Sequence, residues 1–230
     1  MKPWVFETFC RNDIIIMKEI KKRPLSKLEI SNSKIEMDFA YNIDFDEEKE
    51  DFEYMSKKNK KITIEDILNI EESWDICAPM FNLIDGYEGY DKYLKTSERF
   101  TLEQRYLCAI HWYFGEVING GHHQFFYNST GIVWEDVLNG FKHFKMPEFA
   151  ANFQKVIDYC GGRISFAREE RWDMLEILEE KYGEEFFKIL DEADDFIYDY
   201  EGEENELNYI KSHPEKFVFE GEYESFYNRR

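Results

Sequence analysis

Four residues able to do acid–base or metal chemistry lie within one short stretch: His111, Glu116, His122 and His123. Imidazole and carboxylate groups ligate zinc and act as general acids and bases, so the stretch could form a metal or catalytic site. Its spacing does not favour that interpretation. Adjacent histidines point to different faces of a helix, and no His-Glu-x-x-His pattern is present. A structural corner is therefore the preferred interpretation, with a histidine-dependent enzyme as the less favoured alternative.

A second set of reactive groups is acidic. Residues 169–206 hold 17 Asp/Glu and 3 Lys/Arg. Helical periodicity over 169–180 turns Trp172, Leu175 and Leu178 inward and places a row of carboxylates on the outer face. The candidate partner-binding residues are this row and the acids that follow it: Glu169, Glu170, Asp173, Glu176, Glu180, Asp191, Glu192, Asp194, Asp195 and Asp199.

The density of this charge is close to that of nucleic acid. Six acids less Arg171 leave five net charges over twelve residues, which is about 18 Å of helix or one charge per ~3.6 Å. One strand of B-DNA carries one charge per ~3.4 Å. The alternative is a solvated helix face kept for solubility, which is what most charge runs are. Aromatic residues within the run are expected in the core, because a nucleic-acid binder would surround them with Arg and Lys; they are Phe186, Phe187, Phe196, Tyr198 and Tyr200.

The composition of the whole chain limits the classes of partner. The formal net charge is -20, with 43% hydrophobic residues, so the chain is globular and repels nucleic acid and anionic membranes. Its cysteines lack Cys-x-x-Cys spacing, and the N-terminus does not resemble a signal peptide, so a cytoplasmic protein without a cofactor is expected. The cysteines are Cys10, Cys77, Cys108 and Cys160.

The chain divides into two unequal parts. Residues 1–62 hold 13 Lys/Arg and 13 Asp/Glu, whereas residues 63–230 hold 16 and 36. Alternating apolar residues over 35–45 predict a strand in a small β-type segment, followed by a surface linker or helix at 46–61. From Thr63, a capping-box residue, the pattern becomes helical. The predicted fold is mainly α, a helical domain with a smaller N-terminal β-hairpin or sheet.

The elements that must position the candidate groups are helices joined by a glycine corner. The spacing predicts a helix over 101–118 that stops at 119–121, where glycine adopts left-handed conformations at little cost. A short helix then follows, with His122, Phe125, Phe126 and Ser129 on one face and His123, Gln124 and Tyr127 on the other. Further helices are predicted over 132–141, 147–159 and 169–182.

Nine residues of this corner resemble the signature of a family of small acidic bacterial DNA-mimic proteins: Asn119, Gly120, Gly121, Gln124, Phe125, Phe126, Asn128, Ser129 and Gly131. The likeness covers about residues 101–219. It implies a mainly helical homodimer that binds a helix-turn-helix transcription factor and keeps it off DNA. Two features depart from the family pattern. His122-His123 stands where an aromatic and an acidic residue are expected, and residues 1–62 look like an addition.

Together these observations predict a non-enzymatic regulator or inhibitor that mimics the charge of DNA. Its expected partner is a basic DNA-binding protein, either a transcription factor or a nuclease, with no direct nucleic-acid or membrane binding. The alternative is an immunity or defence-associated protein that binds a toxin or another protein by shape, with the acidic face incidental.

Overall fold

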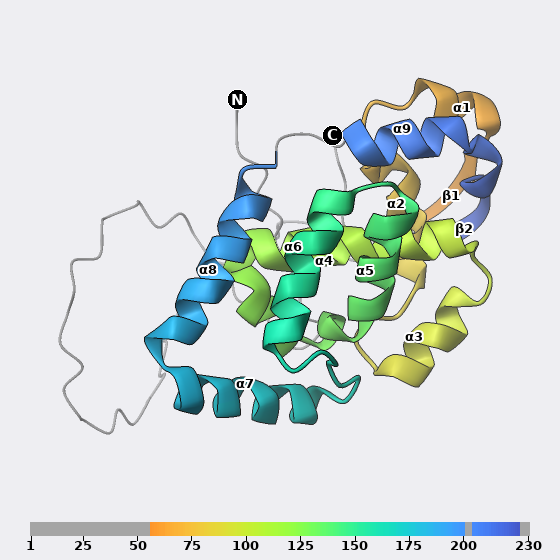
Figure 1. Ribbon diagram of the computed structural model, residues 1–230. Coiled ribbons are helices and arrows are strands. Elements are labelled where there is room, and N and C mark those ends of the chain that lie inside the picture. The colour runs from red at the N-terminus through yellow and green to blue at the C-terminus, as the bar shows by residue number, and fades with distance from the viewer. Residues whose placement is uncertain (1–55, 201–203, 226–230) are drawn as a thin grey trace, which may run out of the picture. The chain divides into compact units, whose positions relative to one another are not determined.

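The computed structural model describes residues 56–200 and 204–225, all of which belong to one compact unit. This part is mainly helical with a small antiparallel sheet, which confirms the predicted fold class (Figure 1). The elements are β1 (Ser56–Ile62), α1 (Ile64–Asn69), α2 (Trp74–Leu83), α3 (Tyr90–Ser97), α4 (Leu102–Tyr127), η1 (Ser129–Val133), α5 (Trp134–His143), α6 (Pro147–Tyr159), α7 (Arg168–Tyr182), α8 (Glu184–Tyr198), α9 (Glu204–Ser212), η2 (Pro214–Lys216) and β2 (Phe219–Ser225).

Helix α4 is the centre of the packing and contacts α2, α5, η1, α7 and α8. In Figure 1 it runs through the middle of the described part, with α7 along the lower edge and α8 rising from the end of α7. Its inward residues form an aromatic core around Tyr113, whose ring contacts Phe125, Phe141 and Phe153. The two acidic helices are thus attached directly to the central helix.

Local sequence signals explain where several helices begin. Thr63 and Asp66 form the predicted capping box of α1, with each side chain bonded to the other residue's backbone N–H. Pro147 begins α6, where its missing N–H would have had no partner in any case. The helix predicted over 147–159 matches α6, and those predicted over 132–141 and 169–182 correspond to α5 and α7 within one or two residues.

The sheet joins two segments that are far apart in the sequence. Strand β1 pairs antiparallel with β2, and Ile62 lies opposite Phe219. Residues 56–61 were predicted as part of a linker or helix; here the structure shows a strand instead, because its partner is supplied by the far end of the chain. β1 therefore packs with the helical part. The strand predicted over 35–45 lies outside the described residues.

Candidate partner-binding surface

The predicted glycine corner is a kink within α4. Gly120 and Gly121 have non-helical backbone angles, so the helix is broken there and restarts as a short segment, 122–127. Gly121 has φ +75°, and a Cβ at this position would lie 2.2 Å from Oδ2 of Asp194. A side chain is thus excluded both by backbone strain and by the carboxylate that occupies the space.

Asp194 of α8 caps the start of this short segment. The backbone N–H of His122 donates to Oδ1 of Asp194 at 2.8 Å, and Nδ1 of the His122 ring donates to the same oxygen. The hydroxyl of Tyr113 lies 2.7 Å from Nε2 of His122. Burial, and secondarily the Asp194 charge, raises the pKa of Tyr113 well above its ordinary value, so this hydroxyl keeps its proton.

The position of Asp194 corrects the sequence-based assignment. It was placed among the partner-binding carboxylates, but it is buried, with both hydrogen bonds directed into the protein. Acidic density in the sequence could not reveal this, because the groups that Asp194 binds lie 72 residues earlier in the chain. Asp194 is a structural anchor of α8 and not part of its outer surface.

Arg171 of α7 holds the other end of the short segment. Its guanidinium is fully buried and donates to the carbonyls of Phe126 at 2.8 Å and Asn128 at 2.7 Å, with longer contacts to those of Ser165 and Phe166. Burial lowers the pKa of Arg171 to about 10, which leaves it charged at neutral pH. A sequence signal for this role exists. Arg171 has the same helical phase as Leu175 and Leu178 and so faces inward with them.

A buried carboxylate, that of Glu116, hydrogen-bonds to side chains on both sides of the corner. Glu116 accepts hydrogen bonds from Gln124 and Asn128, both at 2.8 Å, and from Thr130 at 2.7 Å. Two of these donors belong to the nine-residue motif. Gly131 completes the joint, because a Cβ there would lie 2.6 Å from the carbonyl oxygen of Phe125. The motif is therefore a structural corner, and Glu116 satisfies its polar groups.

The corner determines where both acidic helices attach. An acid from α8 lies at the N-terminal end of the short segment 122–127, and a cation from α7 lies at its C-terminal end. This arrangement matches the helix dipole, which favours negative charge at the first turn and positive charge at the last. The segment therefore fixes α7 and α8 relative to α4.

The predicted carboxylate row is exposed on α7. Its five members are Glu169, Glu170, Asp173, Glu176 and Glu180. In the described part of the chain none of them lies within ion-pair distance of a Lys or Arg side chain; Glu170 accepts a hydrogen bond from Ser165 at 2.6 Å. Glu179, the sixth acid, is held by His123 at 2.8 Å. Five exposed carboxylates, without a Lys or Arg partner in the described part, thus lie within residues 169–180.

Helix α8 carries the second group of acids. Asp191, Glu192 and Asp195 are exposed on α8, and Asp199 is exposed at its C-terminal end. Lys188 is also exposed on this helix, and its positive charge reduces the net negative charge of the outer face. The turn between the two rows is Gly183, with φ +54°.

Two aromatic residues of the acidic run lie outside the core, contrary to the sequence-based expectation. Phe187 is 43% exposed and Tyr198 is 49% exposed, whereas Phe186 is buried and Phe196 and Tyr200 are partly buried. Both exposed rings belong to one edge of α8, at offsets of 0 and 11.

The histidines of the alternative enzyme site have separate partners. His111 contacts the hydroxyl of Ser73 at 2.8 Å, His122 binds Asp194, and His123 contacts Glu179 on α7. Glu116 is engaged by its three donors. Within residues 56–200 and 204–225, no group of three or more His, Cys, Asp or Glu side chains could hold a metal ion.

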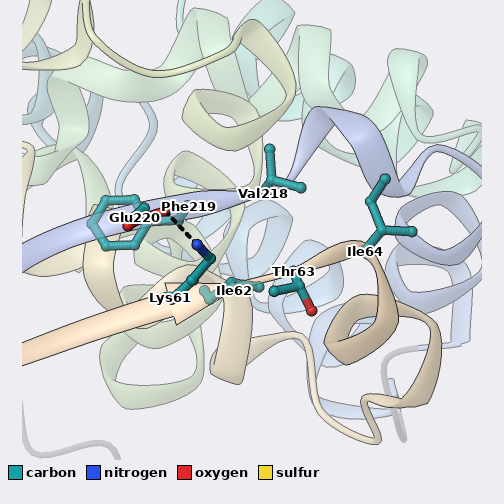
Figure 2. Close-up of a pocket in the computed structure, with 7 residues that line it drawn as sticks. All are labelled: Lys61, Ile62, Thr63, Ile64, Val218, Phe219 and Glu220. Carbon is teal, nitrogen blue, oxygen red and sulfur yellow. Dashed lines mark ion pairs between the residues drawn. The ribbon is translucent and has the colours of Figure 1, made fainter.

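A pocket of about 340 Å³ lies at the end of the sheet (Figure 2). It is formed by residues 61–64 and 218–220, and no residue of α7 or α8 lines it. It is lined mainly by apolar side chains, and its two charged groups, Lys61 and Glu220, are paired with each other at 2.8 Å. None of the predicted site residues lines it. No helix in the described part combines the length and apolar character needed to cross a membrane.

Comparison with known proteins defines the class to which the corner and its helices belong. The family of DMP19-like proteins matches residues 98–213, which is just over half of the chain. The chain therefore belongs to the DMP19-like family, a family of DNA mimics. The matched region begins before α4 and ends after α9, so it contains the corner and both acidic helices. Neither the curated proteins nor the solved structures give a match.

Proposed function

We propose that this protein is a non-enzymatic regulator whose exposed carboxylates on α7 and α8 occupy the DNA-binding surface of a basic protein, such as a transcription factor or a nuclease. The observation that supports the proposal most is the row on α7. Five exposed carboxylates without a Lys or Arg partner in the described part lie along about 18 Å of helix, one per ~3.6 Å.

The way that α7 is held also supports mimicry. A flexible acidic tail would attract any cation, whereas a polynucleotide backbone presents its charges at fixed intervals. Arg171 fixes the inner face of α7 to the end of α4, so the outer row is held by a defined backbone. Membership of a DNA-mimic family makes the same function the first to test.

The test uses the full chain as bait in extract of its native cells. One variant, the row variant, neutralises four of the five members of the row: Glu169→Gln, Asp173→Asn, Glu176→Gln and Glu180→Gln. A matched control removes the same charge from four scattered exposed acids: Glu71→Gln, Glu98→Gln, Glu135→Gln and Glu215→Gln. The wild type and the control should capture the same basic DNA-binding protein, and the row variant should not.

Competition with DNA then separates mimicry from recognition by shape. A duplex carrying the binding site of the captured protein should displace the wild type, because both ligands occupy one cationic surface. A captured partner that binds DNA and this protein simultaneously, or that binds the row variant as tightly as the wild type, would instead favour the immunity-type binder.

A further inference from the structure

We infer that the acidic surface contains a subsite for an arginine side chain of the partner, formed by an aromatic strip of Trp172, Tyr127, His123 and Phe187. The inference rests on the proposed function and specifies how that surface would distinguish one cationic protein from another. None of the nine motif residues and none of the ten predicted acids belongs to this strip.

The strip is continuous across three helices. Tyr127 and His123 belong to the end of α4, and their rings stack at 6.2 Å. The ring of Trp172 on α7 lies 5.3 Å from that of Tyr127. The His123 ring lies 6.2 Å from that of Phe187 on α8. Tyr127 is 47% exposed and Phe187 is 43% exposed. The strip thus connects the two helices that carry the carboxylates.

Exposed rings within a strongly acidic surface need an explanation beyond solubility. Carboxylates attract both Lys and Arg through charge, and the guanidinium fork of Arg also matches their geometry. Aromatic faces add attraction for a cation, and guanidinium groups stack on them more often than ammonium groups do, because guanidinium is planar and weakly hydrated. Rings next to carboxylates therefore form a site for arginine in particular.

One end of the strip already shows this chemistry within the chain. The guanidinium carbon of Arg168 lies 4.9 Å from the ring centroid of Trp172 and 5.8 Å from that of Tyr127. Its Nε donates to the backbone carbonyl of Tyr127 at 3.0 Å. The other end, at His123 and Phe187, has no such cation in the described part of the chain.

At the end of the strip formed by His123 and Phe187, carboxylates are positioned to bind the partner's arginine. Glu179 is held beside the strip by its contact with Nε2 of His123 at 2.8 Å. Asp191 follows Phe187 by one helical turn and is exposed on the same edge of α8. A guanidinium over Phe187 would thus have a ring beneath it and acids on both sides, the combination that Arg uses in stacked ion pairs.

The experiment compares two peptides of equal charge, octa-arginine and octa-lysine, with the full-length protein at low salt. The wild type should bind octa-arginine about two- to five-fold more tightly, the increment expected of an exposed cation–π contact. The double variant Tyr127→Leu, Phe187→Leu keeps apolar side chains but removes two of the four rings, and should lose most of this preference. Tyr198→Leu, which removes an exposed ring outside the strip, should keep the preference. Circular dichroism and a thermal melt verify that each variant is folded.

The possible results separate the two proposals. Equal binding of both peptides by the wild type, or an unchanged preference in the double variant, would overturn the arginine subsite; the proposed function would still stand if binding remained sensitive to salt and to neutralisation of the α7 row. If neither peptide bound at low salt, electrostatic capture and the subsite that rests on it would both be wrong.

Discussion

At the scale of single residues, the corner depends on buried charges that act on backbone groups. Asp194 caps one end of the segment 122–127, and Arg171 binds carbonyls at the other end. Glu116 accepts hydrogen bonds from side chains of the corner. A buried charge is tolerated when hydrogen bonds replace the water it has lost. Removing any one of these charged groups would leave the polar groups that it binds buried without that partner.

Asp194→Ala should destabilise the protein by about 3 kcal/mol, since it leaves the backbone N–H and Nδ1 of His122 buried without an acceptor. Urea unfolding would measure the change. Its neighbour Asp195 is exposed and makes no side-chain hydrogen bond in the described part. Asp195→Ala should therefore stay within about 0.5 kcal/mol of the wild type. Equal effects of the two substitutions would show that the cap contributes no stability.

The glycine at the kink can be tested with a second glycine of similar backbone conformation. Gly121 has φ +75° and Gly89 has φ +95°, but only at Gly121 would a Cβ meet another group, the Asp194 carboxylate. Gly89→Ala should cost about 1–3 kcal/mol from backbone strain alone. Gly121→Ala should cost more, because it also displaces the cap. Thermal melting of both variants would reveal the difference, and an equal loss would argue against a close contact.

At the scale of elements, helices α4 to α7 and the break in α4 were predictable because local signals encode them, whereas α2, α3, α8 and α9 were not predicted. The glycine pair indicated the break in α4, and periodicity indicated the outer row of α7. The sequence did not reveal the strand β1 or the burial of Asp194, because each depends on a partner far along the chain. Arg171 was counted as surface charge although its helical phase matches that of buried leucines, so there the available signal was missed.

Arg171 should be the group that attaches α7 to the rest of the molecule. Arg171→Met would remove the guanidinium hydrogen bonds to the carbonyls of Phe126 and Asn128, so hydrogen exchange over residues 168–182 should quicken before that of α5. Arg168→Met is the matched control. The carbonyl of Tyr127 would still receive the indole N–H of Trp172 at 2.8 Å, and exchange should change little. Uniform acceleration across all helices in Arg171→Met would indicate global destabilisation instead.

At the scale of the whole molecule, the charge of -20 is a cost to folding, and the proposed function gives that charge a use. Like charges repel in the compact state, and carboxylates four residues apart on a helix destabilise it slightly. The row on α7 contains two such pairs, Glu169 with Asp173 and Glu176 with Glu180. A surface kept only for solubility would not need this arrangement.

Salt should therefore stabilise the folded protein. Raising the ionic strength from about 0.01 M to about 0.1 M shortens the Debye length from about 30 Å to about 10 Å and screens the repulsion. The melting temperature should rise with sodium chloride, and potassium chloride should act alike. A melting temperature that falls over this range would mean that attractive ion pairs, and not repulsion, dominate the surface.

The most direct test of the central claim is the affinity for the captured partner, measured from about 0.05 M to about 0.3 M salt with the wild type, the α7 row variant and the scattered-acid control. Mimicry of a polyanion predicts a steep loss of affinity with salt for the wild type and the control, and weaker binding with a shallower slope for the row variant. Equal affinities and flat slopes for all three proteins would contradict the account.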